Sequence, residues 1–141
     1  MELVRCTLAA EGELRRLAAL SHPLEGCGIL LGRFAADGAE VVEVRKGTNL
    51  RADRARDRYV LDPRDILAAE RDARAGGLEV VGFWHTHPDH PARPSQYDAD
   101  HAWPDYVYVI MAIHSGRQVD VTAWVLEEGD FPHFRAEPLD S

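Results

Sequence analysis

The spacing of apolar residues along the chain predicts three helices. Leucines and alanines recur at roughly helical intervals over Leu8–Leu20, so an amphipathic helix is expected there. A second helix is expected over Asp62–Gly77, because an aspartate at the N-cap position precedes a proline and two glycines end the pattern. A short third helix is expected over Ser95–His101, where Ser-x-x-Asp forms a capping pattern.

Shorter apolar runs between these helices predict a β-sheet. Two runs are separated by AADGA and form an expected hairpin, and two others are joined by residues 114–117 in a second hairpin. The run before His85 is apolar apart from one glutamate, as is typical of a central strand covered on both faces. The expected strands are Gly28–Gly32, Glu40–Arg45, Leu78–Trp84, Asp105–Ile113, Gln118–Leu126 and, confined to an edge by Pro132, Phe131–Phe134.

These elements predict an α/β protein with a mixed, mainly antiparallel sheet, one helix before it and one in the middle. The length of 141 residues fits a single domain over residues 1–141, with no linker at which to divide it. Apolar residues make up 45% of the chain and charged residues 28%, which is typical of soluble globular proteins.

Charge and cysteine content exclude several partners and compartments. The net charge of −8 would repel phosphate backbones, so no nucleic-acid partner is expected. No membrane association is expected either, since no stretch approaches the roughly 18 to 20 uncharged apolar residues of a span. The first thirty residues lack the apolar core of a signal peptide. With only Cys6 and Cys27 the chain has no disulfide framework, and we expect a cytoplasmic protein.

The segment after the central strand carries residues that suit a metal ion. His85 and His87 are two positions apart on an extended segment, so both imidazoles lie on one face, while the residues before and between the two histidines face the other way. A short helix that begins at Ser95 would present Asp98 as a third ligand. Two histidines and one carboxylate leave a tetrahedral position open, which is the form of a catalytic zinc site.

A second segment, His22–Gly32, reads HPLEGCGILLG and places Glu25 directly before an apolar run. A carboxylate is costly in such a place unless it faces a cleft or an ion. Cys27, two residues on, is expected to be a small core residue beside it.

Together the two segments resemble the JAMM signature of the MPN-plus metalloproteases. Glu25 precedes the GCGILLG strand, HTHP follows the central strand, seven residues separate His87 from Ser95, and two separate Ser95 from Asp98. This combination is far more specific than a histidine pair alone. The resemblance covers nearly the whole chain, fits the small prokaryotic type, and implies an MPN domain of cytidine-deaminase-like architecture.

The resemblance implies a zinc metalloprotease and a role for each of five residues. His85, His87 and Asp98 would bind one Zn²⁺ per chain. Glu25 would act as general acid/base on the zinc-bound water, and Ser95 would hydrogen-bond the tetrahedral oxyanion.

Several of these assignments have an alternative at the sequence level. Ser95 would serve equally as a simple helix cap. Asp100 is a rival of Asp98, although the spacing from Ser95 favours Asp98. His90 is expected to be solvated, with contact to substrate as the alternative. The remaining histidines are expected to be surface or structural residues: His22, His101, His114 and His133.

The resemblance also implies a substrate class. Family members cut isopeptide or peptide bonds after the C-terminal Gly-Gly of ubiquitin-like proteins, and small prokaryotic members act on sulfur-carrier proteins of that fold. The arginine-rich segment Thr48–Tyr59 is the expected carrier-facing surface, unless its arginines pair with Asp53, Asp57 and Asp62 and face water.

Two other functions compete with this one. A noncatalytic MPN scaffold would usually lack the metal ligands, all of which are present here. A zinc amidase acting on a small substrate fits the same ligand set. The oligomeric state, the pairing of the cysteines, and the choice between deconjugation and amino-acid release are left open by the sequence.

Overall fold

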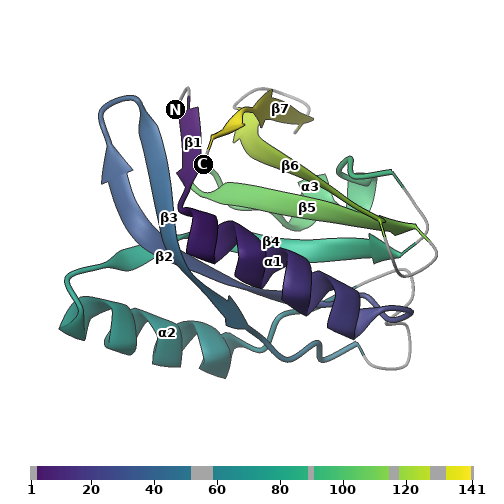
Figure 1. Ribbon diagram of the computed structural model, residues 1–141, viewed down its shortest axis with the longest axis horizontal. Helices are drawn as coiled ribbons and strands as arrows, with labels where there is room; N and C mark the ends of the chain where they lie inside the picture. The colour runs from purple at the N-terminus through teal and green to yellow at the C-terminus, as the bar shows by residue number, and fades with distance from the viewer. Residues whose placement is uncertain (1–2, 52–58, 89–90, 115–117, 128–132, 141) are drawn as a thin grey trace.

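The computed structural model describes residues 3–51, 59–88, 91–114, 118–127 and 133–140. They form one eight-stranded sheet with the order β7-β6-β5-β4-β2-β3-β1-β8 and helices packed against it (Figure 1). The elements are β1 (Leu3–Cys6), α1 (Leu8–Ser21), β2 (Cys27–Ala35), β3 (Gly38–Lys46), α2 (Pro63–Ala75), β4 (Glu79–Pro88), α3 (Gln96–His101), β5 (Val107–His114), β6 (Gln118–Glu127), β7 (His133–Glu137) and β8 (Leu139–Asp140).

The predicted α/β class with a mainly antiparallel sheet is confirmed. Antiparallel pairs join β2 to β3, β2 to β4, β5 to β6 and β6 to β7. The central strands β4 and β5 are parallel, as are β1 with β3 and with β8. Because parallel neighbours need a crossover, the chain returns from the end of β4 to the start of β5, and α3 lies within this connection.

The two long helices cover opposite faces of the sheet. The apolar side of α1 packs with Trp84 and Val109 in one buried cluster. The small residues of α2 pack with Phe83 and Tyr108 in another. Alternate residues of β4 therefore divide between the two faces, and His85, two positions after Phe83, lies on the face of α2.

The helix boundaries follow the sequence signals closely. Thr7 caps α1 by accepting a hydrogen bond from the backbone of Ala10 (3.2 Å). Asp62 caps α2 by accepting one from the backbone of Arg64 (2.9 Å), with Pro63 at the first helical position. No helix within the described residues is long and apolar enough to cross a membrane.

Some strands differ from the prediction. β4 continues past Trp84 through both histidines, because β2 and β5 go on pairing with it: His85 lies opposite Cys27 on one side and Ile110 on the other. β1 and β8, of four and two residues, are too short to show a period and were not predicted. Of the predicted edge strand, Phe131 and Pro132 lie outside the described residues, and the rest belongs to β7 at the sheet edge.

One glycine near the start of β2 is required by close packing. A Cβ atom at Gly28 would collide with the backbone oxygen of Arg45 and the indole of Trp84. The same indole donates a hydrogen bond to that oxygen (2.9 Å). The packing brings the segment that carries Glu25 close to β4.

Candidate metal centre and active site

The last residues of β4 carry the two histidines on one face of the sheet. His85 is fully buried in the central pairing of β2, β4 and β5, and His87 is slightly more exposed. The β ladder fixes both backbones, which leaves the imidazoles little freedom of position.

The third candidate ligand comes from α3. Ser95 is the N-cap of this helix: its Oγ accepts a hydrogen bond from the backbone N–H of Asp98 (3.0 Å). In return the Ser95 N–H donates to Oδ2 of Asp98 (2.9 Å), which completes a capping box. The cap fixes the Asp98 carboxylate toward β4.

Three ligand atoms converge on one point. The Nε2 atoms of His85 and His87 are 3.1 Å apart, and Oδ2 of Asp98 is 3.2 Å from the first and 3.1 Å from the second. Zinc bonds of about 2.0–2.1 Å in a tetrahedron place ligand atoms about 3.3–3.4 Å apart, so this triangle has nearly the size of one face of a zinc site. Glu25 joins them in a group whose ligand atoms all lie within 4.8 Å of one another. The residues present therefore fit the metal.

Electrostatics keep the Asp98 carboxylate ionised and shift the pKa values of the two histidines in opposite directions. Burial opposes ionisation of Asp98, but hydrogen bonds with the two histidines outweigh it and hold its pKa far below the ordinary value. Burial lowers the pKa of His85. For His87 burial acts in the same direction, yet Asp98 and the Pro91 carbonyl raise its pKa above the ordinary value. The site thus holds an ionised carboxylate and attracts positive charge.

The tautomer of His87 is set by a neighbouring carbonyl. Its Nδ1–H donates to the backbone oxygen of Pro91 (2.9 Å), so Nε2 keeps its lone pair for the site. His85 is held differently. Its Nδ1 is buried and meets no hydrogen-bond partner within the described part of the chain, while its ring stacks on Tyr59 with centroids 4.5 Å apart and planes at 25°.

The sequence did not indicate Thr86 as part of the site. It lies between the two histidines, and its Oγ1 accepts a hydrogen bond from the Gly26 N–H (2.8 Å), while its own N–H donates to the Gly26 carbonyl (3.0 Å). This reciprocal pair ties the segment carrying Glu25 to the strand that carries the histidines. Glu25 itself is only 5% exposed.

The rival residues lie elsewhere. Asp100 is exposed and accepts a hydrogen bond from Gln96 on the surface of α3 (2.8 Å). His114 and His133 are exposed and pair with Asp120 and Glu127. His22 stands at the C-terminal cap of α1, and His90 lies outside the described residues.

Both cysteines are buried free thiols. Burial raises the pKa of Cys6 to about 11 and that of Cys27 to about 12. Cys27 is thus a core residue two positions from Glu25, as the sequence predicted.

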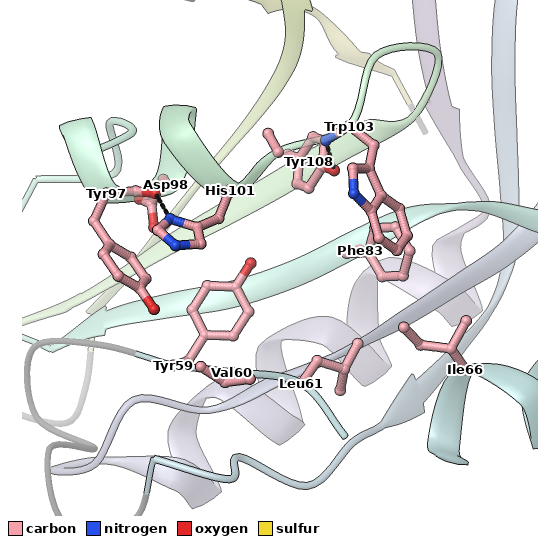
Figure 2. A pocket seen from close by; sticks show the side chains of 11 residues that line it. Tyr59, Val60, Leu61, Ile66, Phe83, Tyr97, Asp98, His101, Trp103 and Tyr108 are labelled. Atoms are coloured by element: carbon pink, nitrogen blue, oxygen red, sulfur yellow. Dashed lines mark hydrogen bonds between the residues drawn. The ribbon is translucent and has the colours of Figure 1, made fainter. Parts of the chain in front are cut away.

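An aromatic pocket adjoins the metal centre. Figure 2 shows Tyr59 between the α3 residues on one side and the apolar residues that precede α2 on the other. The cavity has a volume of about 220 Å³. His101, expected as a surface residue, is exposed but also lines this cavity. The lining residues are Tyr59, Val60, Leu61, Ile66, Phe83, Tyr97, Asp98, His101, Ala102, Trp103 and Tyr108.

The predicted carrier-facing segment Thr48–Tyr59 is described only at its two ends. Arginines 54, 56 and 58 and aspartates 53 and 57 lie outside the described residues. Asp62, offered as a partner for these arginines, pairs with Arg64 within its own helix cap (2.8 Å).

Comparison with known proteins agrees with this architecture. Residues 7–127 match the family of prokaryotic homologues of the JAB domain. The chain is 34% identical over 113 residues to a desampylase of Haloferax volcanii, covering 75% of this chain and 79% of that protein. It is 30% identical over 110 residues to a desampylase of Pyrococcus furiosus, covering 77% of this chain and 71% of that protein.

Two solution structures share the fold over nearly the whole length. A protein of Desulfitobacterium hafniense matches with a TM-score of 0.83 at 28% identity, covering 99% of this chain and 94% of that chain. A protein of Salinibacter ruber matches with a TM-score of 0.74 at 38% identity, covering 96% and 90%. The predicted resemblance, and with it a hydrolase of the JAMM type, is confirmed. The chain belongs to the family of prokaryotic homologues of the JAB domain.

Proposed function

We propose that this protein is a zinc-dependent isopeptidase or peptidase that hydrolyses the amide bond after the C-terminal Gly-Gly of a ubiquitin-like or sulfur-carrier protein. The observation that carries the proposal is the convergence of His85, His87 and Asp98 on one point, with Glu25 beside them. Two relatives named desampylase, a hydrolase of ubiquitin-like conjugates, support this substrate class.

In this mechanism His85, His87 and Asp98 hold the zinc ion. When bound, the ion supplies a Lewis acid that lowers the pKa of water and polarises the scissile carbonyl. Glu25 takes the proton of the attacking water and returns it to the leaving amine. Glu25 is buried, and its ligand atom lies within 4.8 Å of those of the three candidate zinc ligands, so it is close enough to reach a water held there.

The capping role of Ser95 is compatible with a catalytic role. Its Oγ accepts the hydrogen bond of the helix cap, so its O–H remains a donor. We propose that this O–H stabilises the oxyanion that forms when the carbonyl is attacked.

The neighbouring pocket suits a part of the substrate other than the Gly-Gly itself. Glycines carry no side chain, whereas this cavity has aromatic walls and shares Asp98 with the metal centre. We propose that it receives an apolar side chain of the substrate close to the scissile bond.

The test is mass spectrometry of a ubiquitin-like carrier extended beyond its Gly-Gly and incubated with the zinc-loaded protein. We expect cleavage directly after Gly-Gly by the wild type, and a fall in turnover of at least about 100-fold for Glu25→Gln with zinc retained. If Glu25→Gln cleaves as fast as the wild type, the mechanism is wrong. Absence of cleavage across several carriers, with zinc bound, would instead favour a small amide substrate or a scaffold.

A further inference from the structure

A narrow two-stranded ribbon connects β3 to α2 and passes beside the metal centre. Residues 48–50 run antiparallel to residues 60–62: Leu50 N–H donates to the Val60 carbonyl (2.7 Å) and Asp62 N–H to the Thr48 carbonyl (2.9 Å). Asn49 pairs with Leu61 in the middle of this ribbon.

Within the described residues, the side chain of Asn49 makes three hydrogen bonds to backbone groups. Its Oδ1 accepts from the N–H of Arg51 (3.0 Å) and from the N–H of Val60 (2.9 Å). Its Nδ2 donates to the carbonyl of Glu25 (3.1 Å). The amide orientation is unambiguous, because the reverse orientation would place the NH₂ group against two N–H donors and the oxygen against a carbonyl.

These three bonds reach both sides of the candidate active site. Val60 follows Tyr59, whose ring stacks on His85. Glu25 lies before the start of β2, so sheet pairing does not fix its backbone. The next residue, Gly26, is tied to Thr86 between the two histidines. Asn49 therefore supplies an anchor of the Glu25 segment to the ribbon that follows β3, in addition to the link with β4.

We propose that Asn49 is a positioning residue for the general acid/base: its amide holds the Glu25 backbone and the Tyr59 wall at a fixed separation. The catalytic part of this inference rests on the proposed function, whereas the hydrogen bonds themselves can be tested without any substrate. This junction requires a side chain with a donor for the Glu25 carbonyl and an acceptor for two N–H groups. An amide supplies both.

Two substitutions separate the acceptor from the donor. Asn49→Asp keeps an oxygen for Arg51 and Val60 but has no N–H for the Glu25 carbonyl, whereas Asn49→Ala removes all three bonds. Asp65→Ala is the matched control, because Asp65 accepts a hydrogen bond from Thr48 in the same ribbon (2.7 Å) without contacting Glu25.

The first readout is independent of activity. By NMR we expect the amides of Arg51 and Val60 to exchange with solvent at least about tenfold faster in Asn49→Ala but not in Asn49→Asp, since exchange follows the loss of a protecting hydrogen bond. The ¹³C shift of the Glu25 carbonyl should move in both Asn49 variants and stay in place in Asp65→Ala. Unchanged exchange in Asn49→Ala, or an unmoved Glu25 carbonyl, would overturn the proposal.

The second readout is turnover of a cleavable carrier. We expect Asn49→Asp to lower kcat by about 10- to 100-fold with KM and zinc content unchanged, because a small displacement of a reacting group is costly. Asp65→Ala should keep the wild-type kcat. A wild-type kcat in Asn49→Asp would overturn the positioning role. If the wild type itself cleaves no carrier, the proposed function fails, while the NMR readout still decides whether Asn49 anchors Glu25.

Discussion

Asp98 has partners of two kinds: the cap of its own short helix and the two histidines at the end of β4. Its Oδ2 accepts the Ser95 N–H within the capping box and also faces the Nε2 atoms of His85 and His87. A residue that closes a helix end and faces two imidazoles is positioned before any ion arrives. The candidate metal site is therefore preorganised by ordinary helix-capping chemistry.

This dual role predicts how two neighbouring aspartates differ. Asp98→Asn keeps an oxygen for the cap but loses the negative charge, so zinc affinity should fall by about 100-fold or more. Mutation of a residue that only supports a ligand typically lowers metal affinity by about 10- to 100-fold, and loss of a ligand charge should cost more. Asp100→Asn is the control, since Asp100 contacts Gln96 on the surface instead. Competition with a chelating dye measures both affinities. A loss of zinc in Asp100→Asn alone would reverse the assignment.

Single residues of the site differ in how far the sequence could reveal them. His85, His87, Ser95 and Asp98 could be identified from the sequence because they are close together in the chain, and the directions of side chains within one strand or one helix follow from its period. Asn49 and Thr86 could not be found in this way. Asn49 reaches Glu25 across 24 positions and Thr86 reaches Gly26 across 60, and only the folded sheet brings these pairs together.

At the level of elements, α3 depends on its cap. A helix of six residues is too short to be stable by itself, so its position depends on the capping box and on packing. Asp98 and Ala99 are its buried residues. Any weakening of the cap should therefore be felt directly at the metal centre.

Two substitutions distinguish the capping and catalytic roles of Ser95. Ser95→Ala removes the cap and the O–H, and should cost about 1 kcal/mol of unfolding free energy. Ser95→Asp restores a good N-cap without a hydroxyl donor, so stability should largely return. If the O–H stabilises the oxyanion, kcat falls in both variants by about 10²- to 10³-fold. Denaturant unfolding and steady-state kinetics measure the two effects, and a normal kcat in Ser95→Asp would leave Ser95 with capping alone.

The length of β4 shows where element prediction from sequence ends. The apolar run predicts the strand only as far as Trp84, because the polar residues His85, Thr86 and His87 end that run. The strand continues to Pro88 because β5 pairs with it from Gly82 to Pro88 and β2 pairs with it as far as His85. The histidines obtain their rigid backbone from these neighbours. The helices, in contrast, were predicted well because their caps are local signals.

At the level of the whole molecule, the parallel pair β4 and β5 determines where the site can lie. The crossover between them brings α3 over the end of β4, on the face that also carries α2 (Figure 1). The ribbon before α2 closes the other side of the same region with Tyr59. The metal centre and the aromatic pocket therefore lie on one face of the sheet, with α3 on one side and the ribbon before α2 on the other. Because these segments are far apart in the chain, no single stretch of sequence predicted the pocket.

Trp103 allows a test of whether the aromatic pocket takes part in substrate recognition. It lies in the connection from α3 to β5, lines the pocket beside Phe83, and remains 54% exposed (Figure 2). If the pocket receives an apolar side chain, Trp103→Ala should raise KM by about 10-fold for carriers with a bulky apolar residue near the scissile bond, since burying such a side chain contributes about 1.5–3 kcal/mol. The value of kcat should change little, because Trp103 is not among the candidate metal ligands or proton-transfer residues.

The matched control is Leu67→Ala, because Leu67 is also an exposed apolar residue, lies on α2 and does not line the pocket. Steady-state kinetics with two carriers, one with leucine and one with alanine at the tested position, separate the contributions. The increase in KM should be confined to Trp103→Ala and to the leucine carrier. An equal increase for both carriers would mean that Trp103 contacts the body of the carrier, and the pocket would then have no part in reading the residue near the scissile bond.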